Sequence, residues 1–175
     1  MDPVTNSVLI DRPREAVFEY LADVANHLEF SDHYLRDFRL TREDTYGYGA
    51  GARFRLDIPG NRFGFAEFTV IEFDRPRRLV LAGRASKYNR TRMLWEYELE
   101  DEHGGTEVRL TTETVPGLLS DRLAEGLFLT RGWFKRNQGK ALRRLRSIVE
   151  EGRGRGARAT IATGPRKPAS RFRYN

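Results

Sequence analysis

The chain has 175 residues, enough for one ordinary domain with a sizeable core, and it contains no cysteine, which excludes disulfides and thiolate metal sites. It has neither an apolar run of about 18 residues nor the features of a secretory signal, so we expect a cytoplasmic protein without a transmembrane segment. Residues 152–175 hold seven of the 31 basic residues and no acid, so the net charge of +6 describes this tail more than the nearly neutral body.

The first predicted element is a strand at residues 4–10, which is short and apolar and comes shortly before Pro13. Because proline suits the first turn of a helix, the chain is expected to pass there from strand to helix. Apolar residues then recur every three or four positions, which predicts one buried helix face made of Val17, Leu21, Val24 and Leu28. A second short helix is expected around residues 31–35.

Between residues 37 and 115 the apolar period changes to two, which indicates strands. Six are predicted, near residues 37–42, 51–58, 63–73, 78–84, 90–99 and 106–115. Short connections rich in glycine and proline favour antiparallel hairpins, with one covered face and one wet face. The segment 63–73 carries aromatic residues on both faces, so either a bulge shifts its register or its outer face meets another surface.

A long helix is predicted over residues 120–151, after Pro116 and Gly117 end the sheet. One stripe of it should face the sheet, and this stripe consists of Leu119, Leu123, Leu127, Thr130, Phe134, Asn137, Ala141, Leu145 and Ile148. Thr130 and Asn137 interrupt the apolar series. An unpaired buried amide would cost about 1 to 3 kcal/mol, so a ligand, a water molecule or a neighbouring polar group is expected beside them.

Three motifs stand at the junctions of these elements: Ile10-Asp-Arg-Pro-Arg-Glu-Ala-Val-Phe-Glu-Tyr-Leu-Ala-Asp, Val70-Ile-Glu-Phe-Asp-Arg-Pro-Arg-Arg-Leu-Val and Gly104-Gly-Thr-Glu-Val-Arg-Leu-Thr. With the order of elements, they resemble the SRPBCC superfamily, which includes START lipid-transfer domains, Bet v 1-like proteins and bacterial polyketide cyclase/dehydrase-like domains. The resemblance covers about residues 4–150. It implies an α+β helix-grip fold, in which a seven-stranded curved antiparallel sheet wraps around the long C-terminal helix, with one or two short helices after the first strand.

The resemblance also implies a deep cavity between the concave face of the sheet and the long helix, where relatives bind lipids, sterols, polyketides or plant hormones. The residues expected to line it here are Phe54, Leu56, Met93, Trp95, Tyr97, Leu110, Thr112, Leu127, Thr130, Phe134 and Asn137. A mostly apolar lining with a few polar groups is typical of a small-molecule pocket. The predicted function is therefore binding, transport or sensing of a hydrophobic small molecule. The alternative is that these residues form a filled core.

A polyketide cyclase, aromatase or dehydratase is the second hypothesis, and it needs an acid or base within reach of the substrate. The main candidates are Glu67, Tyr97 and His33, and the others are His27, Asp32, Tyr34 and Arg84. Glu67 would be a general base if it pointed inward and an ordinary surface charge if it pointed outward. The two histidines and Asp32 do not form a recognisable metal-ligand set, and no nucleotide or phosphate motif occurs, so no metal and no cofactor are expected.

Residues 152–175 combine glycine, proline and arginine with few large apolar side chains, so they cannot bury enough surface to offset their ordering entropy. We therefore predict a helix-grip ligand-binding domain at residues 1–151 and a disordered basic tail at residues 152–175. The tail is expected to be either a solvated extension or a weak electrostatic contact for RNA, DNA or anionic lipid. The sequence does not indicate an oligomeric state.

Overall fold

The computed structural model describes residues 2–59, 64–85, 91–115, 117, 130–157 and 159–161. Its elements in chain order are β1 (Val4–Ile10), α1 (Arg14–Ala22), η1 (Val24–Asn26), α2 (His27–Ser31), β2 (Leu35–Leu40), β3 (Gly51–Leu56), β4 (Phe65–Asp74), β5 (Arg78–Ala85), β6 (Thr91–Glu102), β7 (Gly105–Val115), α4 (Thr130–Glu151) and β8 (Thr160–Ile161). The predicted order of strands and helices is confirmed. Residues 120–129, where the long helix was expected to begin, lie outside the described residues.

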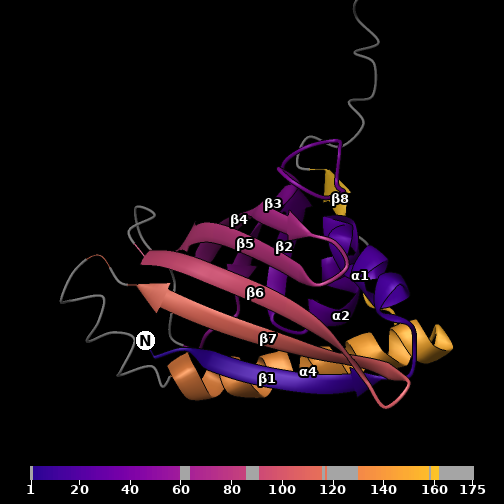
Figure 1. Cartoon of the computed structure of the whole chain (residues 1–175). Coiled ribbons are helices and arrows are strands. Elements are labelled where there is room, and N and C mark those ends of the chain that lie inside the picture. Colours follow the sequence, from indigo (N-terminus) through magenta and orange to yellow (C-terminus); the bar gives the residue numbers. More distant parts are fainter. Residues whose placement is uncertain are drawn as a thin grey trace, which may run out of the picture.

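Seven strands pair antiparallel in the order β1-β7-β6-β5-β4-β3-β2, so the long sheet has β1 at one end and β2 near the other. The sheet is strongly curved, and α4 runs along its lower side beneath β1 and β7 (Figure 1). Helix α4 packs against both β1 and α2, and α2 leads directly into β2. The helix therefore bridges the two ends of the curved sheet and closes its concave face, which confirms the helix-grip fold.

The first helical region differs from the prediction because Asp23 interrupts it. Asp23 has an extended backbone (φ −87°, ψ 104°), and its carboxylate accepts a hydrogen bond of 3.0 Å from the amide of Ala25. An aspartate that bonds nearby backbone amides favours a cap over a helix interior. The helix α1 therefore stops at Ala22, and the second short helix is α2 at His27–Ser31 rather than a helix at residues 31–35.

Strand β4 contains the bulge that was one of the two explanations for aromatic residues on both of its faces. Its pairing with β5 shifts register between Val70 and Glu72. Before the bulge, Ala66, Phe68 and Val70 are buried, so Glu67 lies on the outer face of the sheet. The open question of the direction of Glu67 is thereby answered in favour of the outward alternative.

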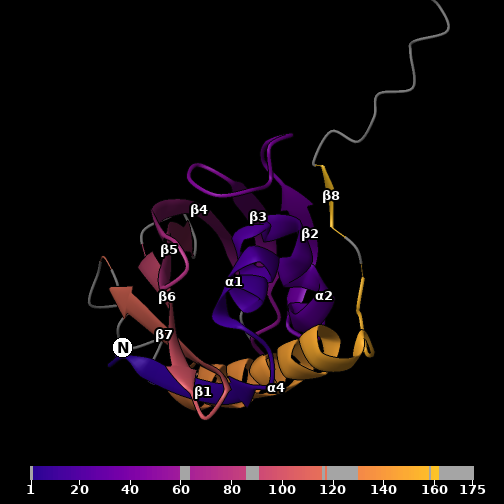
Figure 2. The same cartoon turned by 45° about the vertical axis from the view of Figure 1, so that its right-hand side comes forward.

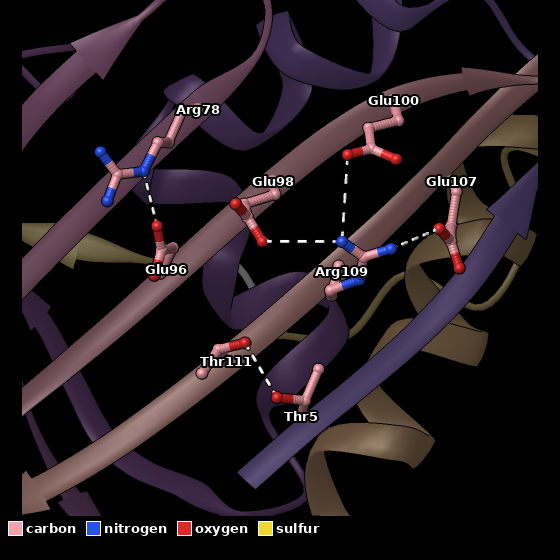
Figure 3. A network of polar contacts seen from close by, with 8 residues as sticks. All are labelled: Thr5, Arg78, Glu96, Glu98, Glu100, Glu107, Arg109 and Thr111. Carbon is pink, nitrogen blue, oxygen red and sulfur yellow. Dashed lines mark hydrogen bonds and ion pairs between the residues drawn. The ribbon is translucent and has the colours of Figure 1, made fainter. Parts of the chain in front are cut away.

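The outer face of the sheet is covered with ion pairs between neighbouring strands. Arg109 on β7 contacts Glu98 and Glu100 on β6 and Glu107 on its own strand, and Arg78 on β5 contacts Glu96 on β6 (Figure 3). Exposed pairs of this kind each contribute little to stability. They show that this face is solvated. An apolar binding site is therefore expected in the interior, on the concave side of the sheet.

The predicted boundary of the disordered tail needs correction, because the chain stays attached to the body beyond residue 151. We call residues 152–157 and 159–161 the C-terminal strap. It rises from the end of α4, and β8 pairs in parallel with β2 (Figure 2). The amide of Gly156 donates to the carbonyl of Glu29 (2.7 Å), and the amide of Ala157 donates to the carboxylate of Asp32 (2.9 Å). Residues 162–175 lie outside the described residues.

Charge explains why the composition of the strap misled the prediction. Arg155 pairs with Glu29 at 3.1 Å, and Arg144 of α4 contacts both the carboxylate of Asp32 and the carbonyl of Gly154. The strap buries little apolar surface but is held by charge-assisted hydrogen bonds to two acidic residues, which are stronger than neutral ones. Basic residues near the end of the chain therefore serve, in part, to attach the chain to its own body.

A Gly156→Ala substitution should release the strap. A Cβ atom at this position would lie 2.2 Å from the Asp32 carboxylate and 2.7 Å from the carbonyl of Glu29, and the backbone carbonyl cannot easily move away. We expect hydrogen exchange of the Ala157 amide to accelerate about tenfold or more while exchange in β6 stays unchanged. Gly132→Ala is the control, because no atom lies within 4 Å of a Cβ built there. Unchanged protection of Ala157 in Gly156→Ala would contradict this view of the strap.

Within the described residues, no helix is both long enough and apolar enough to cross a membrane.

Candidate ligand-binding site

The interior between sheet and helix is dominated by aromatic side chains from several strands. Phe38 on β2 stacks on Phe54 of β3, with ring centroids 5.7 Å apart. Phe68 of β4 contacts Phe54 at 5.4 Å and Trp95 of β6 at 5.7 Å. Because alternate side chains of a strand point to one face, the concave surface gathers these four rings from four strands. We call Phe38, Phe54, Phe68 and Trp95 the aromatic cluster.

A small buried cavity of about 20 Å³ lies beside the aromatic cluster. Its lining consists of His27, Ser31, Tyr34, Leu35, Phe54, Phe68, Leu81, Trp95 and Tyr97. Such a volume holds one water molecule or one oxygen atom of a ligand. His27 and Ser31 come from α2, Tyr34 follows that helix, and Tyr97 comes from β6. The short helix therefore brings polar groups to one end of an otherwise apolar interior.

His27 is buried and uncharged at neutral pH. Its Nε2 atom lies 2.8 Å from the carbonyl oxygen of Leu21, and because a carbonyl oxygen only accepts, Nε2 must carry the proton. Burial lowers the pKa of His27 to about 4, although the hydrogen bond to Leu21 and the charge of Asp23 oppose this effect. The ring also packs edge-on against Tyr97, with centroids 5.7 Å apart. His27 thus presents a neutral imidazole to the cavity.

The two tyrosines of the cavity keep their protons. Burial raises the pKa of Tyr34 to about 12, although a hydrogen bond with Ser31 lowers it slightly. Burial also raises the pKa of Tyr97 well above its ordinary value, and the nearby Tyr34 adds to the effect. Within the described part of the chain, the hydroxyl of Tyr97 makes no hydrogen bond. It is therefore a donor without a protein acceptor at the edge of a buried cavity.

A second, more open pocket of about 350 Å³ lies under the strap. It is lined by Leu28, Asp32, His33, Leu35, Arg36, Asp37, Phe38 and Ala157. Leu35 lines both this outer pocket and the small cavity. We call the two voids the inner cavity and the outer pocket.

Charged groups at the outer pocket serve mainly to hold the strap and α4 in place. Burial alone would raise the pKa of Asp32, but hydrogen bonds from Ala157 and Arg144 outweigh it and lower the pKa. His33 donates from Nε2 to the carbonyl of Asn137 at 3.1 Å, and burial lowers the pKa of its imidazole. The Nδ1 atom of His33 is buried, and no described residue bonds to it. His33 is therefore a link between α2 and α4 rather than part of the inner cavity.

The predicted lining residues fall into four sets. Phe54, Trp95 and Tyr97 line the inner cavity. The next group is buried in the same interior without lining that cavity, and it consists of Leu56, Met93, Leu110, Thr112, Thr130 and Phe134. Leu127 lies outside the described residues. Asn137 differs from the prediction, because its side-chain amide donates to the carbonyl of Trp133 on its own helix, at 2.9 Å.

Gln138 takes the interior position that was assigned to Asn137. Its side chain is fully buried and donates from Nε2 to the hydroxyl of Thr112 at 2.6 Å, while its Oε1 atom is buried and no described residue bonds to it. Residues 137 and 138 stand three and four positions after Phe134, so both fit a helical stripe. The spacing could not distinguish them. Thr130, Phe134 and Gln138 follow steps of four along α4.

Of the three main catalytic candidates, only Tyr97 reaches the inner cavity. Glu67 lies on the outer face and pairs with Arg53 at 3.0 Å, so it is a surface charge. It also borders an open pocket of about 580 Å³ on the sheet, with Arg84 and Arg92. The sequence missed four residues that border the inner cavity, namely Ser31, Leu35, Phe68 and Leu81. A short helix that begins at residue 27 would have pointed to the first two.

The curved sheet closed by one long helix defines a helix-grip protein. The chain belongs to the family described as polyketide cyclase/dehydrase and lipid transport, whose family model matches residues 1–150. Among curated proteins no sequence matches this chain.

Solved structures share the fold at low sequence identity. The KanY protein is 17% identical, with a TM-score of 0.68 over 85% of this chain and 97% of its own. TTHA0849 from Thermus thermophilus is 19% identical, with a TM-score of 0.63 over 84% and 96%. Major latex-like protein 151 from Panax ginseng is 11% identical, with a TM-score of 0.53 over 78% and 95%. These likenesses establish the fold alone.

Proposed function

We propose that the protein binds a hydrophobic small molecule in the inner cavity and the space that opens from it past Leu35. The observation that carries this proposal is the unpaired hydroxyl of Tyr97 at a buried void among aromatic rings. Burial keeps the hydroxyl of Tyr97 protonated, so it can donate to an oxygen atom that enters the inner cavity. A ligand that accepts this hydrogen bond would gain affinity from it.

The inner cavity is too small to hold a drug-sized ligand unless the protein rearranges, since such ligands occupy pockets of roughly 300 to 1,000 Å³. The outer pocket of about 350 Å³ has the required size and shares Leu35 with the inner cavity. We infer that rotation of Leu35 joins the two, so that the apolar part of the ligand lies against Phe38 and Leu28. Burial of the ligand's apolar surface, at roughly 25 cal/mol per Å², supplies most of the affinity.

The test is a titration of the full chain with N-phenyl-1-naphthylamine, an uncharged dye whose fluorescence rises in apolar surroundings. We expect saturable binding to the wild type and binding about three- to tenfold tighter in Leu35→Ala, because the joined void no longer needs to be opened. Leu40→Ala is the matched control, since Leu40 is a buried leucine of the same strand. It should bind the dye like the wild type. Absence of saturable binding in both the wild type and Leu35→Ala would refute the proposal.

A polyketide cyclase, aromatase or dehydratase is the second candidate function. The observation that favours it is the presence of a protonated hydroxyl, Tyr97, and a neutral imidazole, His27, at one cavity. Such a pair could give and take a proton. Binding requires neither group to move a proton, however, so it is the simpler function for this arrangement.

We further propose that α4 contributes to contact with a polyanion. Arg155 of the strap and Arg144 of α4 are engaged with Glu29 and Asp32, so their charges are partly neutralised within the molecule. The outward side of α4 carries exposed cations, namely Arg131, Lys135, Arg136, Lys140 and Arg143. A helix face of this kind attracts phosphate groups of RNA, DNA or anionic lipid through charge alone.

A further inference from the structure

The inner cavity is polar without being charged. Its lining includes one imidazole and three hydroxyl groups, from Ser31, Tyr34 and Tyr97, and none of its lining residues is Asp, Glu, Lys or Arg. The imidazole of His27 is neutral at neutral pH because burial lowers its pKa. The charged residues of α2 point elsewhere: Glu29 accepts a hydrogen bond from Tyr20 and pairs with Arg155 of the strap.

This pattern has a direct consequence for a ligand's buried end. An ionised carboxylate or ammonium group entering the inner cavity would lose its water without gaining a partner of opposite charge, which is strongly unfavourable. A wholly apolar end would enter, but it would leave the hydroxyl of Tyr97 unpaired. An uncharged oxygen avoids both penalties, because it accepts the proton of Tyr97 and carries no net charge.

The volume agrees with the same chemistry. About 20 Å³ is the space of one oxygen-sized group, so the inner cavity fits an atom rather than a ring. The rings of Phe54, Phe68 and Trp95 border the cavity next to this position. An oxygen attached directly to a flat, apolar body would therefore place that body against the aromatic cluster.

We propose that the ligand is a neutral molecule with a ketone carbonyl or a hydroxyl oxygen attached to a flat apolar body, and that Tyr97 donates a hydrogen bond to this oxygen. The proposal rests on the proposed function, because it specifies which hydrophobic molecules the site accepts. Tyr97 is in this view the residue that determines specificity. Ser31 and Tyr34 complete the polar surroundings of this oxygen. His27, which is neutral, adds no charge to these surroundings.

Three probes of nearly equal shape test the proposal: 2-acetonaphthone with a ketone, 2-isopropenylnaphthalene with a CH₂ group in place of the ketone oxygen, and 2-naphthoate with a carboxylate. Their affinities for the full chain are measured at pH 7 by quenching of tryptophan fluorescence, since Trp95 borders the site. We expect the ketone to bind about tenfold tighter than the hydrocarbon, as one net hydrogen bond would give. The carboxylate should bind more weakly than both.

Tyr97→Phe removes the donor and keeps the ring, so the ketone and the hydrocarbon should then bind with equal affinity. Tyr46→Phe is the control, because Tyr46 is partly exposed and bonds Glu19 away from the cavity. Its preference for the ketone should match that of the wild type. Circular dichroism shows whether each variant is folded. If Tyr97→Phe does not fold, the preference of the wild type for the ketone over the hydrocarbon still tests the proposal.

The outcomes separate this proposal from the proposed function. If none of the three probes binds, the proposed function itself fails. If the hydrocarbon binds as tightly as the ketone, or if Tyr97→Phe keeps the preference, the protein binds hydrophobic molecules but Tyr97 does not select them. If 2-naphthoate binds most tightly, a cation serves the site and the inferred class of ligand is wrong.

Discussion

Replacing Phe54 with alanine should lower the free energy of unfolding by about 3 to 5 kcal/mol. Phe54 is 2% exposed and contacts three other rings, those of Phe38, Phe68 and Trp95. Its removal gives up the transfer free energy of the ring and leaves a cavity that neighbouring rigid strands cannot close. Urea unfolding followed by circular dichroism measures the loss.

The control for this substitution lies on the next strand. Phe65→Ala removes the same side chain from the outer face of β4, where it is 55% exposed, and should change stability by no more than about 0.5 kcal/mol. Because the void left by Phe54→Ala adjoins the inner cavity, benzene should bind there and raise the midpoint of thermal unfolding. A loss below about 1 kcal/mol in Phe54→Ala would show that the aromatic cluster is not tightly packed.

Acid should destabilise the protein through His27. The ordinary pKa of histidine is about 6.5, whereas burial lowers the pKa of His27 to about 4 in the folded protein. As the pH falls below 6.5 the unfolded chain takes up a proton, but the folded chain does so only near pH 4. The contribution of His27 is therefore fully present above pH 6.5 and declines between pH 6.5 and 4, by about 3 kcal/mol in total.

The measurement compares urea unfolding at pH 7 and pH 4 in the wild type and in His27→Gln, which can still donate to the carbonyl of Leu21. Carboxylates titrate in both proteins, so the difference between the two pH dependences isolates the histidine. His103→Gln is the control, because the side chain of His103 is 82% exposed in a hairpin. Equal pH dependence in wild type and His27→Gln would mean that the imidazole is not buried in a neutral state.

The sheet could be predicted from the sequence because the period of its apolar residues is unambiguous. Strand β1 was expected at the residues where it occurs, and in β6 the buried residues include Met93, Trp95 and Tyr97, which were expected to face inward. A period of two assigns every side chain to a face once one is known. The bulge in β4 was anticipated only as one of two possibilities, because a sequence does not show where an extra residue enters a pairing.

The polar details of the site could not be predicted in the same way. Asn137 and Gln138 are adjacent amides on one helix, and a rotation of about 100° between neighbours decides which of them faces the sheet. The break at Asp23 moved α2 toward the N-terminus, and this placed His27 and Ser31 at the inner cavity. The attachment of the strap depends on Glu29 and Asp32, which are more than 120 residues away from Arg155 and Ala157.

The resemblance to ligand-binding families implied a deep cavity, and the described interior is more filled than that expectation. Aromatic rings occupy most of the space, and the inner cavity keeps only about 20 Å³. The sequence allowed either a pocket or a filled core, and the interior has features of both. The proposed site must therefore open before it can bind a ligand. We propose Leu35, which lines both voids, as the place of this opening.

A crystal structure of the full chain with 2-acetonaphthone tests the central claim most directly. It should show the naphthalene ring against Phe38 and Leu28, the side chain of Leu35 rotated away, and the ketone oxygen within hydrogen-bonding distance of the Tyr97 hydroxyl. A structure in which the probe occupies only the outer surface, with the aromatic cluster and Leu35 unchanged, would contradict the claim that this interior is a binding site.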